Sequence, residues 1–217
     1  MSRLPQLLPG IQVVAHPDPL NAVYHSLLET APRLIREHNP DIVVNVGLAP
    51  DQSYFGVEQS APRDGYHQVP DMERRVLSKA ESSRAVWGKK SPEVLETSFD
   101  LAHVLDLWKR KLSWNPALSS SGGRKGARAA TKGKAPPPSP PAVVDVRHTD
   151  DVGNYVCGLT YYASLAELAQ RSNDNDGGSR YAVFLHVPPL QTEEDFRRGS
   201  LVLAGLIESL VEVWGQR

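Results

Sequence analysis

The chain of 217 residues contains a single cysteine, Cys157, and therefore cannot form an internal disulfide. Small secreted scaffolds usually depend on several disulfides, so this scarcity favours a protein of a reducing compartment. The sequence also lacks an apolar run of the roughly 18 to 20 residues that cross a bilayer, and its N-terminus holds too short an apolar stretch for a signal peptide. We expect a soluble cytoplasmic protein with no membrane partner.

An excess of charge of one sign is also missing, because 24 Lys and Arg residues stand against 25 Asp and Glu residues. Nothing in this balance steers the protein toward nucleic acid, and we expect no nucleic-acid partner. Glycine-rich phosphate loops and His-Glu-x-x-His helices are absent, and the seven histidines show no metal-ligand spacing. The sequence predicts no cofactor and no metal, and it leaves the oligomeric state open.

Short apolar runs alternate along the chain with stretches of helical period, which is the pattern of an α/β fold with a largely parallel sheet. The apolar runs predict strands at residues 11–15, 41–47, 143–147 and 181–187. The helical stretches predict a helix at 20–38 with a kink at Pro32, another around Cys157, and a last one at 193–214.

Two predicted helices carry start signals in their sequence. Asp150 or Asp151 is a plausible N-cap of the helix around Cys157. Thr192 and Asp195 resemble a capping box that opens the last helix. The apolar stripes of these helices are read as ordinary core packing.

Residues 113–141 break the pattern, because they are rich in serine, glycine and proline and have almost nothing to bury. Such a segment cannot offset its conformational entropy, so we predict a disordered low-complexity insertion within the domain. A nuclear-import signal or a patch for an acidic partner is one interpretation of its five basic residues, and ordinary solvation is the other; these residues are Arg124, Lys125, Arg128, Lys132 and Lys134.

Three reactive groups follow predicted strands. Cys157 lies near the start of a helix, where unpaired N–H groups and the helix dipole favour a thiolate. His186 ends the strand at 181–187, and the strand at 41–47 leads into a polar loop that ends in Glu58. If these strands are parallel neighbours, the three side chains meet at one edge of the sheet. A thiol, an imidazole and a carboxylate suffice for covalent acyl transfer.

Each of these residues also has a purely structural interpretation. A lone cysteine is often a small buried apolar residue, and a histidine inside an apolar strand is often a hydrogen-bonded core residue. Glu58 taken alone is a surface carboxylate. Asp51, Asp64 and Asp71 compete with it for the same role, and the sequence pattern does not choose among them.

Several segments resemble the pyroglutamyl peptidase I family of intracellular cysteine peptidases. The run Asp150-Asp-Val-Gly-Asn-Tyr-Val-Cys157 is similar to the family's nucleophile segment, and Val183-Phe-Leu-His-Val-Pro-Pro189 is similar to its histidine segment. Asn45-Val-Gly47 followed by Val57-Glu58-Gln59 resembles the segment of the catalytic glutamate in the form seen in eukaryotic members. The resemblance covers most of the chain outside residues 113–141.

The resemblance implies a single domain over residues 1–217, built as a three-layer α/β/α sandwich around a largely parallel (mixed) sheet. It also implies hydrolytic removal of an N-terminal pyroglutamyl (5-oxoprolyl) residue from peptides, through a thioester and without a cofactor. By matching position, Cys157 is the nucleophile, His186 the general base and then acid, and Glu58 the group that orients His186.

The sequence departs from the family pattern at two places. The core strand and the Gly-Phe-x-Pro-Phe loop that normally open the family's sequence have no match here, although this loop contributes aromatic residues to the lactam pocket. Gly158 stands where the family usually carries Asn or Asp, and a glycine there should loosen the helix by up to ~1 kcal/mol relative to alanine. We expect the triad geometry to persist while turnover is weak or absent. The alternatives are an active peptidase, a catalytically weak or inactive relative that acts as a binding protein, and an interaction protein that uses its basic, proline-rich insertion.

Overall fold

A computed structural model describes residues 4–82, 91–115, 118, 144–171 and 178–217 of the chain. Its centre is a four-stranded sheet in the order β1-β6-β2-β5. These strands are β1 (Val43–Leu48), β6 (Ala182–Val187), β2 (Phe55–Glu58) and β5 (Val146–Thr149). A second, smaller sheet pairs β3 (Ser60–Pro62) with β4 (Val94–Glu96) in antiparallel fashion.

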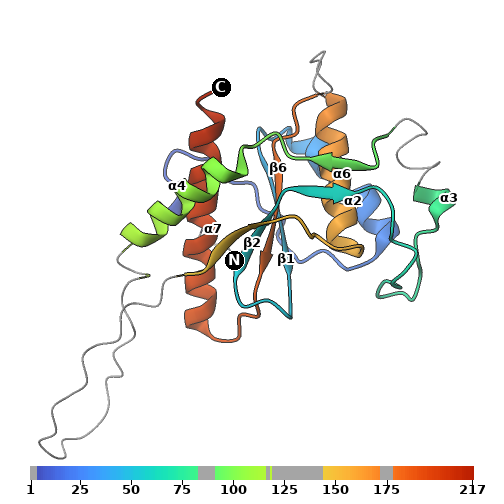
Figure 1. Ribbon diagram of the computed structural model, residues 1–217, viewed down its shortest axis with the longest axis horizontal. Helices are drawn as coiled ribbons and strands as arrows, with labels where there is room; N and C mark the ends of the chain where they lie inside the picture. Colours follow the sequence, from blue (N-terminus) through green and yellow to red (C-terminus); the bar gives the residue numbers. More distant parts are fainter. Residues whose placement is uncertain (1–3, 83–90, 116–117, 119–143, 172–177) are drawn as a thin grey trace, which may run out of the picture.

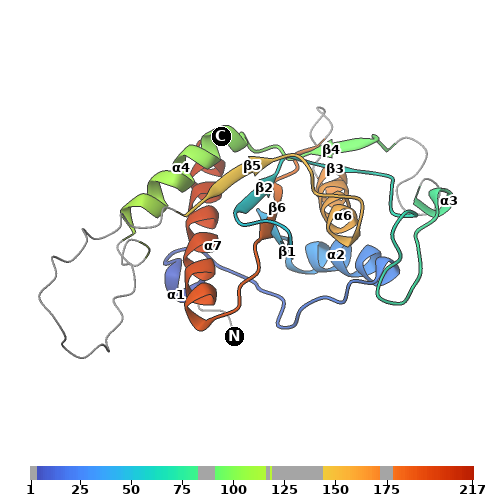
Figure 2. The same ribbon diagram turned by 60° about the horizontal axis from the view of Figure 1, so that its bottom comes forward.

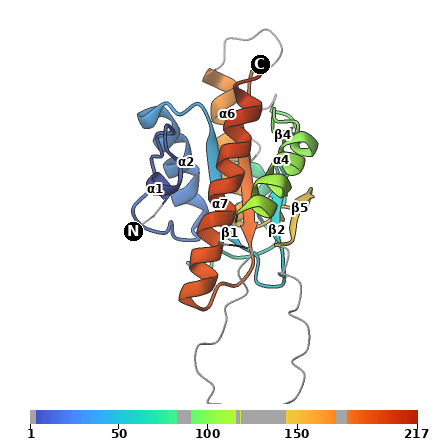
Figure 3. The same cartoon turned by 90° about the vertical axis from the view of Figure 1, so that its left-hand side faces the viewer.

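Helices cover both faces of the central sheet (Figure 1 and Figure 2). On one face α4 (Leu101–Trp114) packs beside α7 (Glu193–Trp214), and Figure 3 shows α7 lying across the strands. On the other face α2 (Tyr24–His38) packs beside α6 (Val156–Arg171). The fold is therefore a three-layer α/β/α sandwich around a largely parallel, mixed sheet, as the sequence predicted.

The central sheet consists of two parallel pairs joined by one antiparallel pairing. β1 runs parallel to β6, and β2 runs parallel to β5, whereas β2 and β6 run in opposite directions. The sequence left open whether the strands at 41–47, 143–147 and 181–187 are parallel neighbours. β1 and β6 are parallel neighbours, but β5 does not pair with β6 and runs opposite to it. β5, which precedes Cys157, and β2, which ends in Glu58, both run opposite to β6, which carries His186.

Each face of the sheet has its own apolar core. The core under α4 and α7 includes Trp108 and Leu206, both fully buried. The core under α6 is smaller and includes Phe184. β1 is one edge strand of this sheet, and its residues Val46 and Leu48 remain 51% and 59% exposed.

Three of the four predicted strands are confirmed as β1, β5 and β6. The strand predicted at residues 11–15 is wrong, because these residues form no strand and Val14 is 57% exposed. A strand is stabilised by packing and hydrogen bonding against neighbours, and this segment pairs with no described strand. Its β-branched composition alone does not create one.

The predicted helices at 20–38 and 193–214 are confirmed as α2 and α7, and Pro32 lies inside α2. Thr192 and Asp195 form the predicted capping box. The N-cap predicted for the helix around Cys157 is wrong, because α6 begins only at Val156. Five further residues separate Asp150 from that start, and they form the loop that brings β5 to α6.

The predicted insertion at 113–141 begins inside α4, which ends at Trp114. Apart from residues 113–115 and 118, this segment lies outside the described residues, and so do all five of its basic side chains. Several elements were not predicted at all. They are β2, β3, β4, α4 and the short helices α1 (Leu4–Leu7) and α3 (Lys79–Glu81).

Candidate active site

The central contact of the site joins Glu58 to His186. Glu58 Oε1 lies 2.7 Å from His186 Nδ1, and the two side chains are 0% and 6% exposed. In the antiparallel pairing of β2 with β6, Gly56 stands opposite His186 and Glu58 stands opposite Phe184. Glu58 thus reaches His186 diagonally across the paired strands.

The Glu58 carboxylate is held through both of its oxygens. Oε1 contacts His186, and Oε2 accepts the backbone N–H of Asp151 at 2.9 Å. Because a carboxylate only accepts hydrogen bonds, the hydrogen in the 2.7 Å contact belongs to His186 Nδ1. This assignment leaves Nε2 as the nitrogen that can take up the proton of the Cys157 thiol.

Cys157 is the second residue of α6 and approaches β1 and β6 from above the sheet. A Cβ atom added to Gly47 would lie 3.1 Å from Cys157 Sγ and 2.6 Å from a ring carbon of Phe184. Gly47 is also the register partner of His186 in the parallel pairing of β1 with β6. The absence of a side chain at Gly47 therefore leaves the space in which the thiol lies above the sheet.

The pKa of His186 depends on its two partners, Cys157 and Glu58. Burial by itself would lower the pKa of this imidazole, but hydrogen bonds with Cys157 and Glu58, together with their charges, outweigh burial and raise the pKa to about 9. The imidazolium form of His186 is thus favoured next to Cys157 and Glu58. An imidazolium beside a cysteine is the arrangement that stabilises a thiolate.

Gly158 has a packing role that the sequence did not predict. A Cβ atom at this position would collide with the backbone carbonyl of Gly153 and would lie 3.3 Å from the Tyr66 ring. Gly153 itself has a φ of +78°, a left-handed conformation that favours glycine. The two glycines allow the loop after β5 to fold tightly against the first turn of α6.

The carboxylates that competed with Glu58 have other partners or positions. Asp64 forms an ion pair with Arg63 at 3.0 Å. Asp71 accepts the backbone N–H groups of Tyr24, Glu73 and Arg75. Asp51 is exposed. Among these four acidic residues, only Glu58 has a described contact with His186.

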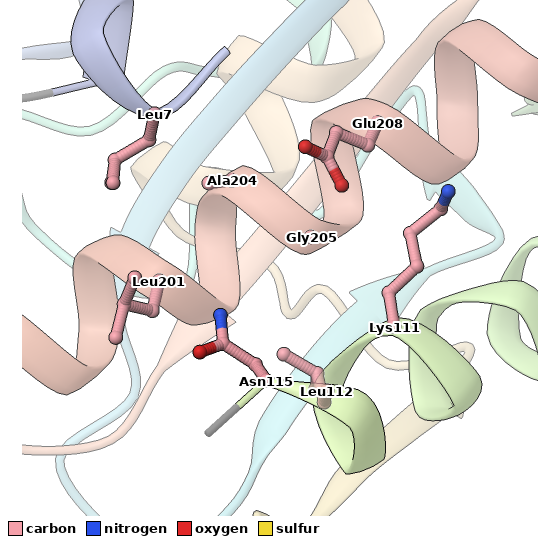
Figure 4. Close-up of a pocket in the computed structure, with 8 residues that line it drawn as sticks. All are labelled: Leu7, Lys111, Leu112, Asn115, Leu201, Ala204, Gly205 and Glu208. Atoms are coloured by element: carbon pink, nitrogen blue, oxygen red, sulfur yellow. The ribbon is translucent and has the colours of Figure 1, made fainter. Parts of the chain in front are cut away.

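The described residues contain no group of three or more His, Cys, Asp or Glu side chains arranged to hold a metal ion. Within the same part of the chain, no helix has the length and apolar character needed to cross a bilayer. A small cavity of about 80 Å³ lies between α1, α4 and α7 (Figure 4). Its lining includes Leu7, Asn115 and Glu208, and it is on the opposite side of the sheet from α6 and Cys157.

The fold resembles that of solved structures of one kind of peptidase. No protein-family model and no curated protein match the chain. Among solved structures, the chain is similar to a mutant pyrrolidone carboxyl peptidase from the hyperthermophile Pyrococcus furiosus. The TM-score is 0.62 at 17% identity, with 99% of this chain and 89% of that chain covered. The structure described with the Cys-free mutant of the same enzyme gives a TM-score of 0.61, also at 17% identity and the same coverage. At this identity the likeness establishes a shared fold.

The three polar residues of the site were predicted from the sequence, whereas the glycine beside the thiol and the backbone donor to the carboxylate were not. Gly47 is an ordinary strand glycine by pattern, and the space that it leaves for the thiol depends on which elements pack against β1. The hydrogen bond from the Asp151 backbone N–H to Glu58 could not be predicted, because every residue except proline has such a donor. A glycine inside a predicted strand, as at Gly47, is the one local signal of a close approach.

Proposed function

We propose that the protein is a cysteine peptidase of the pyroglutamyl peptidase I family, which removes an N-terminal pyroglutamyl residue from peptides. The observation that carries the proposal is the buried 2.7 Å contact of His186 with Glu58, together with Cys157 Sγ beside Gly47, the register partner of His186. The three polar residues come from separate elements, α6, β6 and β2. A core histidine needs one hydrogen-bond partner, whereas this one is held between a carboxylate and the chain's single thiol.

In the proposed reaction, His186 Nε2 takes the proton of the Cys157 thiol, and the thiolate attacks the carbonyl carbon that follows the lactam ring. The tetrahedral intermediate collapses when the His186 imidazolium gives its proton to the leaving amine. The shortened peptide departs, and a thioester remains on Cys157. Water, deprotonated by His186, then attacks the thioester, and collapse releases pyroglutamate and restores the thiol.

The negative charge of the tetrahedral intermediate needs hydrogen-bond donors near Cys157. The first intrahelical hydrogen bond of α6 runs from the Leu159 N–H to the Tyr155 carbonyl at 3.2 Å. Backbone N–H groups that precede it, including that of Cys157 itself, belong to the first turn, where a helix has no internal acceptor for them. We assign these groups to the oxyanion.

The substrate class follows from the resemblance of the Cys157, His186 and Glu58 segments, and the shared fold supports it. A pyroglutamyl ring is neutral, so its recognition needs apolar contacts and backbone hydrogen bonds instead of a charged partner. The reaction requires a reduced Cys157, and we therefore place the protein in a reducing compartment such as the cytoplasm.

A second candidate function is a catalytically weak relative that binds peptides. The exposure of Val46 and Leu48 favours it, because these side chains leave apolar surface on β1, the edge strand of the sheet. An open edge gives a substrate fewer walls to contact. The interaction protein that uses the basic insertion is a third possibility, and its residues lie outside the described part of the chain.

Mass spectrometry of peptide products separates these candidates. We would incubate the chain with a peptide that begins with pyroglutamate and with a matched peptide that begins with proline, whose ring lacks the lactam carbonyl. The proposal predicts loss of the first residue from the pyroglutamyl peptide only. Binding of that peptide without any cleavage would favour the second candidate, and cleavage of both peptides would overturn the assigned specificity.

A further inference from the structure

The three members of the candidate triad lie on three elements, so their spacing depends on how α6 is seated on the sheet. Glu58 and His186 belong to the directly paired strands β2 and β6, and backbone hydrogen bonds fix them to each other. Cys157 belongs to α6, which has no backbone pairing with either strand. Side chains of α6 must therefore set the position of the thiol above His186.

Tyr161 is the side chain best placed to do so. It lies four residues after Cys157, one helical turn along the same face of α6, and it is fully buried. Its hydroxyl lies 3.0 Å from the Glu58 carbonyl oxygen and 3.3 Å from the Ala182 carbonyl oxygen. A third carbonyl, that of Gln59, lies 3.5 Å away. One hydroxyl thus touches the end of β2 and the start of β6.

The hydroxyl of Tyr161 is held in its donor form. Burial raises its pKa above the usual range, so it remains protonated at neutral pH. The shortest contact is with the backbone of Glu58, the residue whose side chain orients His186. The same residue is thereby fixed twice, through its carbonyl by α6 and through its carboxylate by His186 and the Asp151 N–H.

The ring of Tyr161 adds a second connection to the imidazole. Its centroid is 6.0 Å from that of Phe184, with the rings inclined at 52°. The Phe184 centroid is in turn 4.9 Å from that of His186, with an inclination of 55°. Tilted aromatic pairs at these distances are favourable contacts. A shift of Tyr161 would therefore move both the Glu58 backbone and the neighbour of the His186 ring.

We propose that Tyr161 is a positioning residue, whose hydroxyl seats the Cys157 helix against the strands of Glu58 and His186 and so sets the distance between the thiol and the imidazole. The inference rests on the proposed function, in which that distance governs proton transfer. Misplacement of a reacting group by about 1 Å costs on the order of a hundredfold in rate. The hydroxyl contributes by preventing such a misplacement, without touching the substrate.

Tyr161→Phe removes the hydroxyl and keeps the ring, and the chain offers a matched control in Tyr162→Phe. Tyr162 is also fully buried on α6, but its hydroxyl donates to the Pro92 carbonyl at 2.6 Å, close to β4 and away from β2 and β6. Both variants lose a tyrosine hydroxyl that donates to a backbone carbonyl. A loss of stability alone would therefore appear in both.

The first readout is the rate at which iodoacetamide alkylates Cys157 as a function of pH. Cys157 is the only cysteine, so the reaction reports this thiol alone, and it needs no substrate. We expect Tyr161→Phe to slow alkylation about tenfold and to change its dependence on pH, because the thiol would no longer be held beside the imidazole. We expect Tyr162→Phe to keep the wild-type profile.

The second readout is hydrolysis of a pyroglutamyl amide. Tyr161→Phe should lower kcat about tenfold or more and leave KM nearly unchanged, because the hydroxyl acts on the reacting groups and not on substrate binding. A chain without hydrolytic activity whose alkylation profile still shifts with Tyr161→Phe would refute the proposed function and support the role of Tyr161. An alkylation profile that is the same in Tyr161→Phe and wild type would overturn the role of Tyr161 whatever the hydrolysis shows.

Restoring a hydrogen-bond donor at position 161 also tests whether the Tyr161 hydroxyl positions Cys157. A chain with para-aminophenylalanine at position 161 regains an N–H donor at the end of the ring and should recover the wild-type alkylation profile. This variant also serves if Tyr161→Phe fails to fold, as judged by circular dichroism. A restored chain whose profile still differs from that of the wild type would overturn the proposal.

Discussion

Glu58 Oε1 lies 2.7 Å from His186 Nδ1, although 128 positions separate the two residues and their strands run in opposite directions. The antiparallel register of β2 with β6 places Glu58 opposite Phe184, two residues from His186, within reach of the imidazole. The imidazole is held at Nδ1 by Glu58, and its other nitrogen, Nε2, is the one that can exchange a proton with the Cys157 thiol. This relationship, more than the presence of a cysteine, distinguishes the site from an ordinary apolar core.

Glu58→Gln tests whether the carboxylate orients the imidazole. The amide oxygen can still accept the Asp151 N–H, but its NH2 group would then face His186 Nδ1 and force that nitrogen to become an acceptor. The hydrogen would move to Nε2, where a base is needed, so kcat should fall about a hundredfold or more. Steady-state hydrolysis of a pyroglutamyl amide measures this change.

The matched control for that variant is Glu167→Gln. Glu167 is another carboxylate with little exposure, located on α6, and it pairs with Arg36 at 2.7 Å instead of with His186. Its replacement should lower stability while leaving kcat within a factor of about 3. Equal losses of kcat in the two variants would mean that Glu58 acts only on folding.

The raised pKa of His186 predicts a dependence of stability on pH. The folded-state pKa is about 9, against roughly 6.5 in an unfolded chain, so the proton binds more tightly to the native protein. The stabilisation is fully present below about pH 6.5 and is lost as the pH rises through about 9. Urea unfolding of the wild type and of His186→Gln should show a difference that shrinks over this range.

His148→Gln provides the control for that measurement, because His148 lies on β5 with an exposed side chain. A change with pH that is equal in the His148 and His186 variants would assign the effect to the loss of any imidazole and not to His186. If the His186 difference instead grew with pH, the imidazolium form would not be the one that the fold stabilises.

Gly158→Ala separates packing from helix propensity. Propensity alone predicts that alanine stabilises α6 by up to ~1 kcal/mol. The structure predicts the reverse, a loss of roughly 1–3 kcal/mol, because the added methyl group meets the rigid backbone carbonyl of Gly153. Gly215→Ala is the control, since its Cβ would lie 3.4 Å from the Val211 carbonyl, an ordinary contact. A gain of stability from Gly158→Ala in urea unfolding would contradict the packing account.

Much of the fold was predictable because its parts have local signals. The continuous β-branched run of β1 and the capping box of α7 identify these elements without any knowledge of their partners. β2 has no such signal, because it is four residues long and is defined by its pairing with β5 and β6. The strand predicted at 11–15 fails for the converse reason, since it has the composition but no partner.

The candidate site divides in the same way. Cys157 and His186 were found from their positions next to a helix start and a strand end, which are local features. The choice of Glu58 over Asp51, Asp64 and Asp71 was not decidable from the residues, because it depends on the antiparallel register of β2 with β6. Burial of Glu58 at 0% exposure is equally a property of the assembled sheet.

The most direct test of the account compares fluorophore release from a pyroglutamyl amide by the wild-type chain and by Cys157→Ser. Serine keeps the size of the side chain, but its hydroxyl is far less easily deprotonated, and His186 and Glu58 remain in place. We predict release by the wild type and a loss of at least about a thousandfold in Cys157→Ser. Equal rates from the two proteins would contradict the assignment of Cys157 as the nucleophile.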